Sequence, residues 1–469
     1  MSYLSSKPGS SIIALLQKKI PKNREDKLLF NRIFKNFSIG FIGSVSIAMI
    51  GIGRTVLLTK SIPIENFGKI LIILNFFTVL SSFFGLRVND VLYRFLPQFE
   101  KEQNIGALRG LLYSCLGLSL IVGLLIGIGI VILSPWISIR FYNDAALTWP
   151  FRIYSVAMLA YCFDGFNTAI LRLYDRFVCL LVPQVVGSGL TFLVIIVYLL
   201  LLKASNCCEI GWIIAAFAAG AFIQSIVPFI ISIKLIGEKH GWKSKGNPLF
   251  ALRPYKRLLA SNLFHTNLVG YLKIASDNGG VFLLGVLSTP IQVAYFGIAQ
   301  QMMAPLKLIK VNIQNAITPE IMRLWSRKEV TQLYALINGV VRSTAMWGGV
   351  AVVFMVIIIK PLLLIITTSA YISAIPTVCL MILAGFLNFI STSFYPLTVA
   401  MDKMPRRNMI VGLRIFYLGA ALFIGLNSFL LAAVHLLGVI SVRLFSDLPL
   451  FLRLRSMSQT GEVKTILNQ

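Results

Sequence analysis

Long apolar runs separated by short polar segments dominate the chain. Many runs reach about 20 residues, the length at which an α-helix crosses a bilayer, and are longer than ordinary strands. The alternating ten-residue segments typical of a transmembrane β-barrel are absent. The pattern predicts an all-α polytopic membrane protein with twelve spans, near residues 36–58, 68–88, 110–134, 150–173, 178–202, 210–233, 258–285, 289–316, 336–359, 370–400, 408–428 and 430–451.

Composition agrees with this reading and excludes several function classes. The chain has 469 residues, of which 57% are hydrophobic and 13% charged, and its mean hydropathy is +0.82. A soluble domain carries about 25% charged residues. The six cysteines and three histidines show no metal-ligand spacing, and no Gly-Lys-Ser/Thr phosphate loop or Asp-x-Asp pair is present. We therefore expect no enzyme activity, no ATP-driven transport by this chain alone, no cofactor and no metal.

Lys and Arg fall overwhelmingly on one predicted side. With the N-terminal tail placed in the cytoplasm, external segments hold six of the 43 basic residues: Lys60, Lys69, Arg140, Arg152, Lys203 and Lys360. Four more lie within spans: Arg54, Lys273, Arg342 and Arg414. The other 33 are cytoplasmic, so the positive-inside rule predicts both termini in the cytoplasm. Topology thus explains most of the net charge of +26, and no nucleic-acid partner is expected.

The longest polar connection lies in the middle of the chain. Residues 237–257 are strongly basic and separate two groups of six spans. We expect a basic tail at 1–35, a six-helix bundle at 36–236, this cytoplasmic linker at 237–257, a second six-helix bundle at 258–452 and a cytoplasmic tail at 453–469.

A short phrase occurs twice, about 227 positions apart. "SIPIENFG" begins at Ser61 and "STPIQVAYFG" at Ser288, and each precedes an apolar helix and then a Pro-containing segment of mixed charge. Pro97 and Pro319 are expected to break the chain as it leaves the membrane. Because six spans begin and end on the same side, the two halves are expected to be parallel repeats related by a pseudo-two-fold axis along the membrane normal, with a substrate path between them.

Two longer segments carry a family resemblance. "TKSIPIENFGKILIILNFFTVLSSFFGLRVNDVLYRFLPQF" (59–99) and "KIASDNGGVFLLGVLSTPIQVAYFGIAQQM" (273–302) resemble the O-antigen and exopolysaccharide flippase family (Wzx-type) of the multidrug/oligosaccharidyl-lipid/polysaccharide exporter superfamily. The resemblance covers residues 36–450. The chain departs from the family pattern at Ile64, where Pro-Glu is usual, and in its weak final helix pair.

Ionisable residues inside spans are the strongest functional signal, because each is costly in a bilayer unless it is paired or faces water. Arg54 either extends to the external interface or lines the path, and the resemblance favours a basic residue on the inner face of this helix. Asp164 is either a proton or cation coupling site or a structural partner for Arg54. Both alternatives stay open for each residue.

The second half contributes the remaining candidates. Lys273 and Asp277 are four residues apart, so they form either a self-neutralised pair or part of a polar stripe with His265; Asp277 matches an Asp in the resembled family. Lys307 and Lys310 are either solvated anchors or phosphate ligands. Arg342 and Arg414 lie near cytoplasmic helix ends and are expected to extend to the interface.

These candidates include more cations than anions, which suits an anionic substrate. Together with the resemblance, they predict a flippase that moves an undecaprenyl-pyrophosphate-linked glycan repeat unit across the bacterial plasma membrane by alternating access. Arg54, Lys273, Lys307 and Lys310 would bind substrate, and Asp164 or Asp277 would couple to H⁺ or Na⁺. Membrane lipids and polysaccharide polymerase machinery are the other expected partners. The alternatives are a cation-coupled multidrug exporter on the same fold, which calls for an acidic cavity, and a membrane-embedded transferase.

Overall fold

The computed structural model describes residues 24–84, 88–202, 210–241, 248–257, 259–260, 263, 267, 279–401 and 403–460, and all regular structure in these ranges is helical. Ten described helical segments are long and apolar enough to cross a membrane. Most of the expected seventh span lies outside the described residues. The eighth is divided into two shorter helices and is less apolar. The chain is thus an all-α, multi-pass membrane protein.

The first half contains the following helices: α2 (Arg24–Ser61), α3 (Ile64–Phe84), α4 (Val88–Lys101), α5 (Ile105–Tyr142), the 3₁₀ turn η1 (Ala145–Leu147), α6 (Thr148–Tyr161), α7 (Asp164–Leu173), α8 (Phe177–Leu202) and α9 (Ile210–His240). The short elements α10 (Pro248–Ala251) and η2 (Arg253–Tyr255) follow, and α10 packs on α5.

The second half repeats this order. It contains α12 (Gly279–Leu287), α13 (Pro290–Met302), α14 (Ala304–Ser326), α15 (Val330–Ile366), η3 (Ser369–Ala374), α16 (Ile375–Ile390), η4 (Ser391–Ser393), α17 (Phe394–Ala400), α18 (Met404–Ile424), α19 (Ser428–Val442), the π-helical turn η5 (Arg443–Asp447) and α20 (Leu448–Thr460).

Equivalent helices make equivalent contacts in the two halves. The pairs α5–α6, α8–α9, α6–α9 and α4–α7 of the first half correspond to α15–α16, α18–α19, α16–α19 and α14–α17 of the second. Because the pairs follow one another in the same order, the halves are parallel repeats, as the sequence predicts.

The repeat extends to the turns before α5 and α15. Gln103 and Lys328 both have left-handed backbone, with φ of 52° and 59°. The N–H groups of the residues that follow them bond to the carbonyls of Phe99 and Leu324, both at 3.0 Å. This 6→1 bond with a left-handed residue is the hydrogen-bond pattern of a Schellman helix end.

The expected role of the two prolines is therefore wrong. Pro97 and Pro319 lie within α4 and α14, which continue to Lys101 and Ser326. A proline removes only one helical hydrogen bond and often bends a helix rather than ending it. The left-handed residues end these helices instead.

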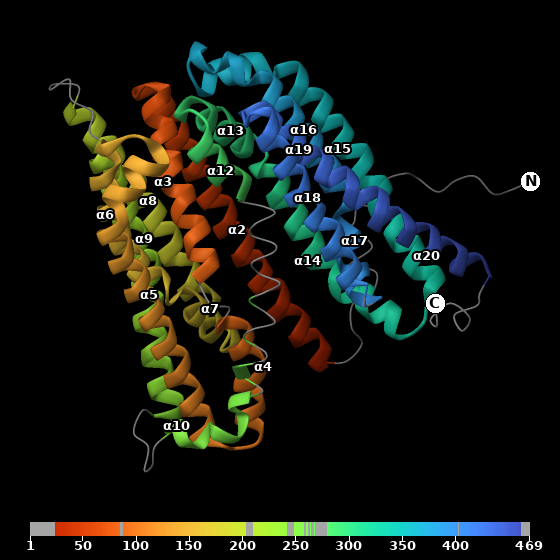
Figure 1. Ribbon diagram of the computed structural model, residues 1–469. Helices are drawn as coiled ribbons and strands as arrows, with labels where there is room; N and C mark the ends of the chain where they lie inside the picture. Colours follow the sequence, from red (N-terminus) through yellow and green to blue (C-terminus); the bar gives the residue numbers. More distant parts are fainter. Residues whose placement is uncertain are drawn as a thin grey trace, which may run out of the picture.

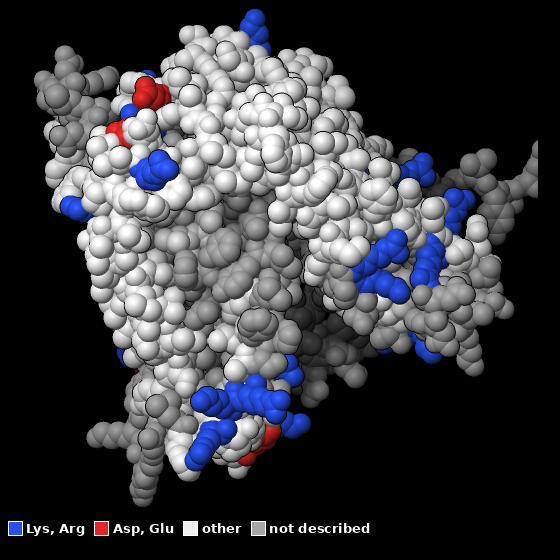
Figure 2. Space-filling model, viewed as in Figure 1, with Lys and Arg blue, Asp and Glu red and all other residues white. Residues whose placement is uncertain are grey.

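The molecule has two arms that meet at one end and diverge toward the other (Figure 1). At the shared end one apolar core joins both halves, with members such as Phe67, Phe77, Phe296 and Val434. The other end has two separate cores. One is built from α4, α5, α7 and α9, and the other from α14, α15, α17 and α20. Figure 2 shows the surface hollowed between the arms.

The repeated phrase lies where the halves meet. Helices α3 and α13, which begin within the two copies, pack directly on each other. A Cβ atom on Gly68 would lie 1.9 Å from the carbonyl oxygen of Pro290, and one on Gly297 would lie 2.2 Å from Cδ1 of Leu71. Gly68 meets rigid backbone, so only glycine permits this close approach of the two helices, whereas Gly297 leaves room for the end of the Leu71 side chain.

Lipid-facing and water-facing surfaces separate clearly. Large apolar side chains such as Ile132, Ile357 and Phe423 are 70%, 72% and 95% exposed, which suits contact with lipid rather than water. Lys and Arg gather on the diverging ends of both arms (Figure 2). The positive-inside rule identifies that end as the predicted cytoplasmic side.

Candidate functional site

Several expected spans are not continuous helices. The fourth is interrupted at Cys162–Phe163, between α6 and α7. The eighth is interrupted at Met303, the tenth at η4 and the twelfth at η5. Interrupted membrane helices expose backbone polar groups and commonly form the binding sites of transporters. The interruptions therefore direct attention to the side chains around them.

The break at Met303 positions two lysines on α14. A Cβ atom on Gly385 of α16 would overlap the end of the Met303 side chain, so Met303 lies over a notch in α16. Lys307 and Lys310 follow on α14, and both line a pocket that also includes Gly385, Asn388 and His435. Lys310 Nζ donates a hydrogen bond to Oδ1 of Asn388, three residues before η4. Two cations and an amide thus converge beside two helix breaks.

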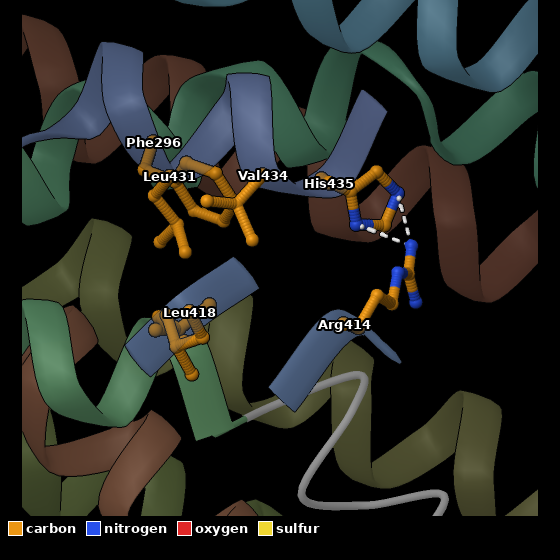
Figure 3. Close-up of a pocket in the computed structure, with 8 residues that line it drawn as sticks. Phe296, Arg414, Leu418, Leu431, Val434 and His435 are labelled. Carbon is orange, nitrogen blue, oxygen red and sulfur yellow. Dashed lines mark hydrogen bonds between the residues drawn. The ribbon is translucent and has the colours of Figure 1, made fainter. Parts of the chain in front are cut away.

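A second pocket adjoins the first at His435. It lies among α12, α13, α18 and α19, and its described lining consists of Gly280, Val281, Phe296, Arg414, Leu418, Leu431, Val434 and His435. In Figure 3 the apolar side chains lie on one side, and Arg414 and His435 face each other on the other. Nη2 of Arg414 lies 2.8 Å from Nδ1 and 3.2 Å from Nε2 of His435.

Arg414 has room to reach His435 because α19 carries a glycine there. A Cβ atom on Gly438 would lie 2.2 Å from Cγ and 2.5 Å from Nε of Arg414. The arginine side chain therefore lies against bare backbone of α19 and remains in the interior of the bundle. The expectation that Arg414 extends to the interface is wrong. Arg342, by contrast, is exposed on α15.

We call Lys307, Lys310, Arg414 and His435 the basic cluster. Its members come from α14, α18 and α19. No Asp or Glu occurs among the described residues that line its two pockets. Guanidinium and ammonium groups in such a setting are ligands for phosphate and similar anions.

Sequence reasoning identified the two lysines but not the Arg414–His435 pair. A signal was available, since the expected spans 408–428 and 430–451 leave room for only a very short turn between them. Arg414 and His435 lie 12 and nine residues from Leu426 in the turn, so their heights differ by only about 4.5 Å at the rise of an α-helix. The turn is residues 425–427, as short as expected.

The first half also has a polar interior, with different chemistry. The guanidinium of Arg54 lies over the ring of Phe217 of α9, 4.3 Å from its centroid. The phenols of Tyr154 and Tyr161 lie near Arg54 and within hydrogen-bonding reach of each other, and Tyr161 is also near Asp164. Arg54 is therefore inside the bundle, where cation–π contact with Phe217 stabilises it.

Asp164 occupies the first turn of α7, not the middle of a continuous helix. A helix N-terminus stabilises negative charge. The carboxyl group lies beside Ser225 of α9, whose carbonyl accepts a 3.0 Å hydrogen bond from Asn167. None of the ion pairs among the described residues joins Asp164 to Arg54. Lys273, Asp277 and His265 lie outside the described residues.

Comparison with known proteins identifies the chain. The family model described as "Polysaccharide biosynthesis protein" matches residues 33–325, more than half of the chain. No curated protein matches significantly. A solved inward-facing multidrug resistance MATE family transporter of the MOP superfamily is 13% identical, with a TM-score of 0.69 over 90% of this chain and 100% of that one.

Two further structures share the fold. The lipid II flippase MurJ, in an inward closed conformation, is 13% identical, with a TM-score of 0.65 over 90% of each chain. An outward-facing MATE transporter is 15% identical, with a TM-score of 0.54 over 91% of this chain and 96% of that one. The fold is therefore that of MOP-superfamily transporters, and by its family model the chain belongs to the polysaccharide biosynthesis protein family.

Proposed function

We propose that this protein is a flippase that moves a lipid-linked oligosaccharide, an undecaprenyl-pyrophosphate-linked glycan repeat unit, from the inner to the outer leaflet of the bacterial plasma membrane. The observation that carries the proposal is the basic cluster beside the breaks at Met303 and η4. The pyrophosphate would bind Lys307 and Lys310, the glycan would occupy the hollow between the arms, and the polyprenyl tail would remain among membrane lipids.

Alternating access follows from the two-armed shape. Arms with separate cores at one end and a shared core at the other can rock about the shared end, so that the hollow opens to one side at a time. The higher TM-scores with inward-facing and inward closed relatives than with an outward-facing one support an inward-open state here. In the first half, Arg54 would be a further cation near the substrate path. Asp164 or Asp277 would be the coupling residue.

A cation-coupled multidrug exporter is the second candidate, because MATE transporters share the fold. Such an exporter with cationic substrates would need acidic side chains in its binding site. The described lining of the two pockets carries basic and apolar groups instead. This charge pattern favours an anionic substrate.

The test is the double substitution Lys307→Gln, Lys310→Gln in the native host, with membrane protein amounts held equal. We expect surface glycan to fall at least about tenfold, the effect of losing roughly 1.4 kcal/mol of substrate binding, and lipid-linked repeat units to accumulate inside. Arg342→Gln is the matched control, because Arg342 is an exposed cation on α15.

Normal glycan display in the double variant would remove the two lysines from the proposed role. If the wild-type gene is deleted and only drug resistance changes, the exporter function replaces the flippase. Polymerase machinery as a partner is tested separately, by co-purification from the same membranes.

A further inference from the structure

The Arg414–His435 contact specifies the protonation state of the histidine. A guanidinium group has only donors, so Arg414 must donate and a ring nitrogen must accept. A protonated imidazole has no free lone pair. Because Nη2 lies 2.8 Å from Nδ1 and 3.2 Å from Nε2, one of these ring nitrogens accepts the hydrogen bond, and the ring is neutral in this arrangement.

His435 is also a wall of the pocket that contains Lys307 and Lys310. The side chain thus has two possible partners, Arg414 in one pocket and an anion held by the lysines in the other. An anion would accept hydrogen bonds from the ring and would favour its protonated form. The neutral ring suits Arg414, and the charged ring suits an anion.

The groups that face His435 are few in the described residues. Arg414 comes from α18, and Lys307 and Lys310 from α14. The lining residues from α12, α13 and α16 are Gly280, Val281, Phe296, Met381, Gly385, Asn388 and Phe389, none of them titratable. His435 is therefore the one imidazole among the described lining residues of the two pockets, and imidazole is the side chain whose unperturbed pKa lies between pH 5 and pH 8.

We propose that His435 couples proton binding to anion binding: the ring is neutral while it accepts from Arg414, and it takes up one proton from solution when a phosphate group binds at Lys307 and Lys310. This inference rests on the proposed function and adds to it a proton-binding residue beside the anion site, separate from the coupling candidates Asp164 and Asp277. Because linkage is reciprocal, acid strengthens anion binding and anion binding draws in a proton.

The test measures binding of geranyl pyrophosphate to the purified full-length protein by isothermal titration calorimetry from pH 5.5 to 8. Repeating each titration in buffers of different ionisation enthalpy gives the number of protons taken up on binding, because the buffer supplies those protons and its ionisation heat adds to the measured heat. His435→Gln is the key variant, because glutamine can still accept from Arg414 but does not titrate. The probe's own titration is common to both proteins and cancels in the ratio of their affinities.

We expect the affinity ratio of wild type to His435→Gln to rise at least about tenfold from pH 8 to pH 5.5, in keeping with linkage of one proton. Wild type should take up about one proton more than the variant. His240→Gln is the matched control. His240 lies far along the chain at the end of α9, where it bonds Tyr174 and Glu100, and its substitution should leave the pH dependence unchanged.

If His435→Gln does not fold, Arg414→Gln provides a second test. Without the facing guanidinium, His435 should protonate more readily, and the midpoint of the pH dependence should move to higher pH. An unchanged midpoint would contradict the proposal, as would a His435→Gln protein with the wild-type pH profile. Wild-type binding with no histidine-dependent proton uptake would overturn this inference alone. Absence of pyrophosphate binding at every pH would overturn the proposed anion site as well.

Discussion

The sixth and twelfth spans both place a glycine against the span before them, yet they accommodate different chemistry. In the first half, a Cβ atom on Gly220 of α9 would lie 1.9 Å from Oγ1 of Thr191 on α8. In the second, Gly438 of α19 makes the same kind of room for Arg414 of α18. Duplication has preserved the packing of this helix pair while the side chain it accommodates has diverged.

The consequence differs between the halves. Thr191 is 2% exposed, and its hydroxyl bonds only to backbone, the carbonyls of Gly187 and Ala216 at 2.9 and 3.3 Å. Arg414 instead extends to His435 and borders a pocket. The first half thus uses the glycine for structure, and the second uses it to hold a charge. Four predictions test or sharpen this contrast.

The largest effect is expected in the polar networks at the diverging ends. In the second half Asp447 pairs with Arg407 at 2.7 Å, and their side chains are 3% and 13% exposed. In the first, Glu100 bonds Tyr174 at 2.7 Å and His240 at 3.0 Å and is 35% exposed. Asp447→Asn leaves a buried guanidinium without its anion and should lower the free energy of unfolding by about 3–5 kcal/mol.

Glu100→Gln is the comparison for this prediction. A partly exposed pair contributes only about 0–1 kcal/mol, so its melting temperature in detergent should change far less than that of Asp447→Asn. Equal losses in the two variants would show that burial does not distinguish the networks.

The second prediction concerns the contact between the halves. Gly68→Ala places a methyl group against the Pro290 carbonyl and should force α3 and α13 apart, at a cost of about 1–3 kcal/mol, typical of overpacking. Surface glycan should fall, and cysteine probes near Gly68 should become more reactive. Gly117→Ala on α5 is the control, because nothing lies within 4 Å of its Cβ position. Normal display with unchanged reactivity would contradict the tight contact.

The third prediction separates the two equivalent glycines. Gly438→Ala should displace Arg414 from His435 and move the midpoint of the pH dependence of geranyl pyrophosphate binding to higher pH, as Arg414→Gln does, whereas Gly220→Ala should affect thermal stability but not this midpoint. Gly419→Ala on α18, which meets nothing within 4 Å, is the control. The same midpoint in the Gly438 and Gly220 variants would argue that Arg414 does not influence the protonation of His435.

The smallest effect is expected at the shared end. Asp144 caps η1 by accepting from the Ala146 N–H at 3.0 Å, and it pairs with Lys69 at 2.8 Å. Burial acts to raise the pKa of Asp144, but the hydrogen bonds from Lys69 and Ala146 outweigh it and hold the pKa below its ordinary value. Its equivalent before η3, Thr368, makes no side-chain cap bond.

The sign of the pH effect follows from that shift. A lowered carboxyl pKa contributes stability that is present above the ordinary Asp pKa and lost as pH falls through the folded value. The melting temperature of wild type should therefore drop on acidification more than that of Asp144→Asn, by an amount equivalent to about 0.5 kcal/mol for a partly exposed pair. Identical acid profiles would exclude a contribution from this carboxylate.

Much of the fold could be predicted because hydrophobic periodicity and charge placement are local properties of the sequence. Apolar runs marked ten of the described helical segments, and the repeated phrase near Pro63 and Pro290 indicated two parallel halves. Helix interruptions at Cys162–Phe163 and at η4 were missed, because apolar runs continue through them. Pro97 and Pro319 were misread because proline signals a local defect, while the left-handed Gln103 and Lys328 end the helices.

The candidate site was predicted only in part for the same reason. Lys307 and Lys310 could be singled out because charge within an apolar stretch is visible in one dimension. Arg414 was expected at the interface, since a sequence does not show that Gly438 leaves space for it.

By itself the sequence determined that the protein is a helical membrane protein with a duplicated plan, because bilayer thickness and the cost of burying charge act on each segment independently. Only the tertiary structure decided which polar groups meet. The partner of a side chain depends on the rotation and spacing of neighbouring helices, and a single missing Cβ at Gly438 brings Arg414 to His435.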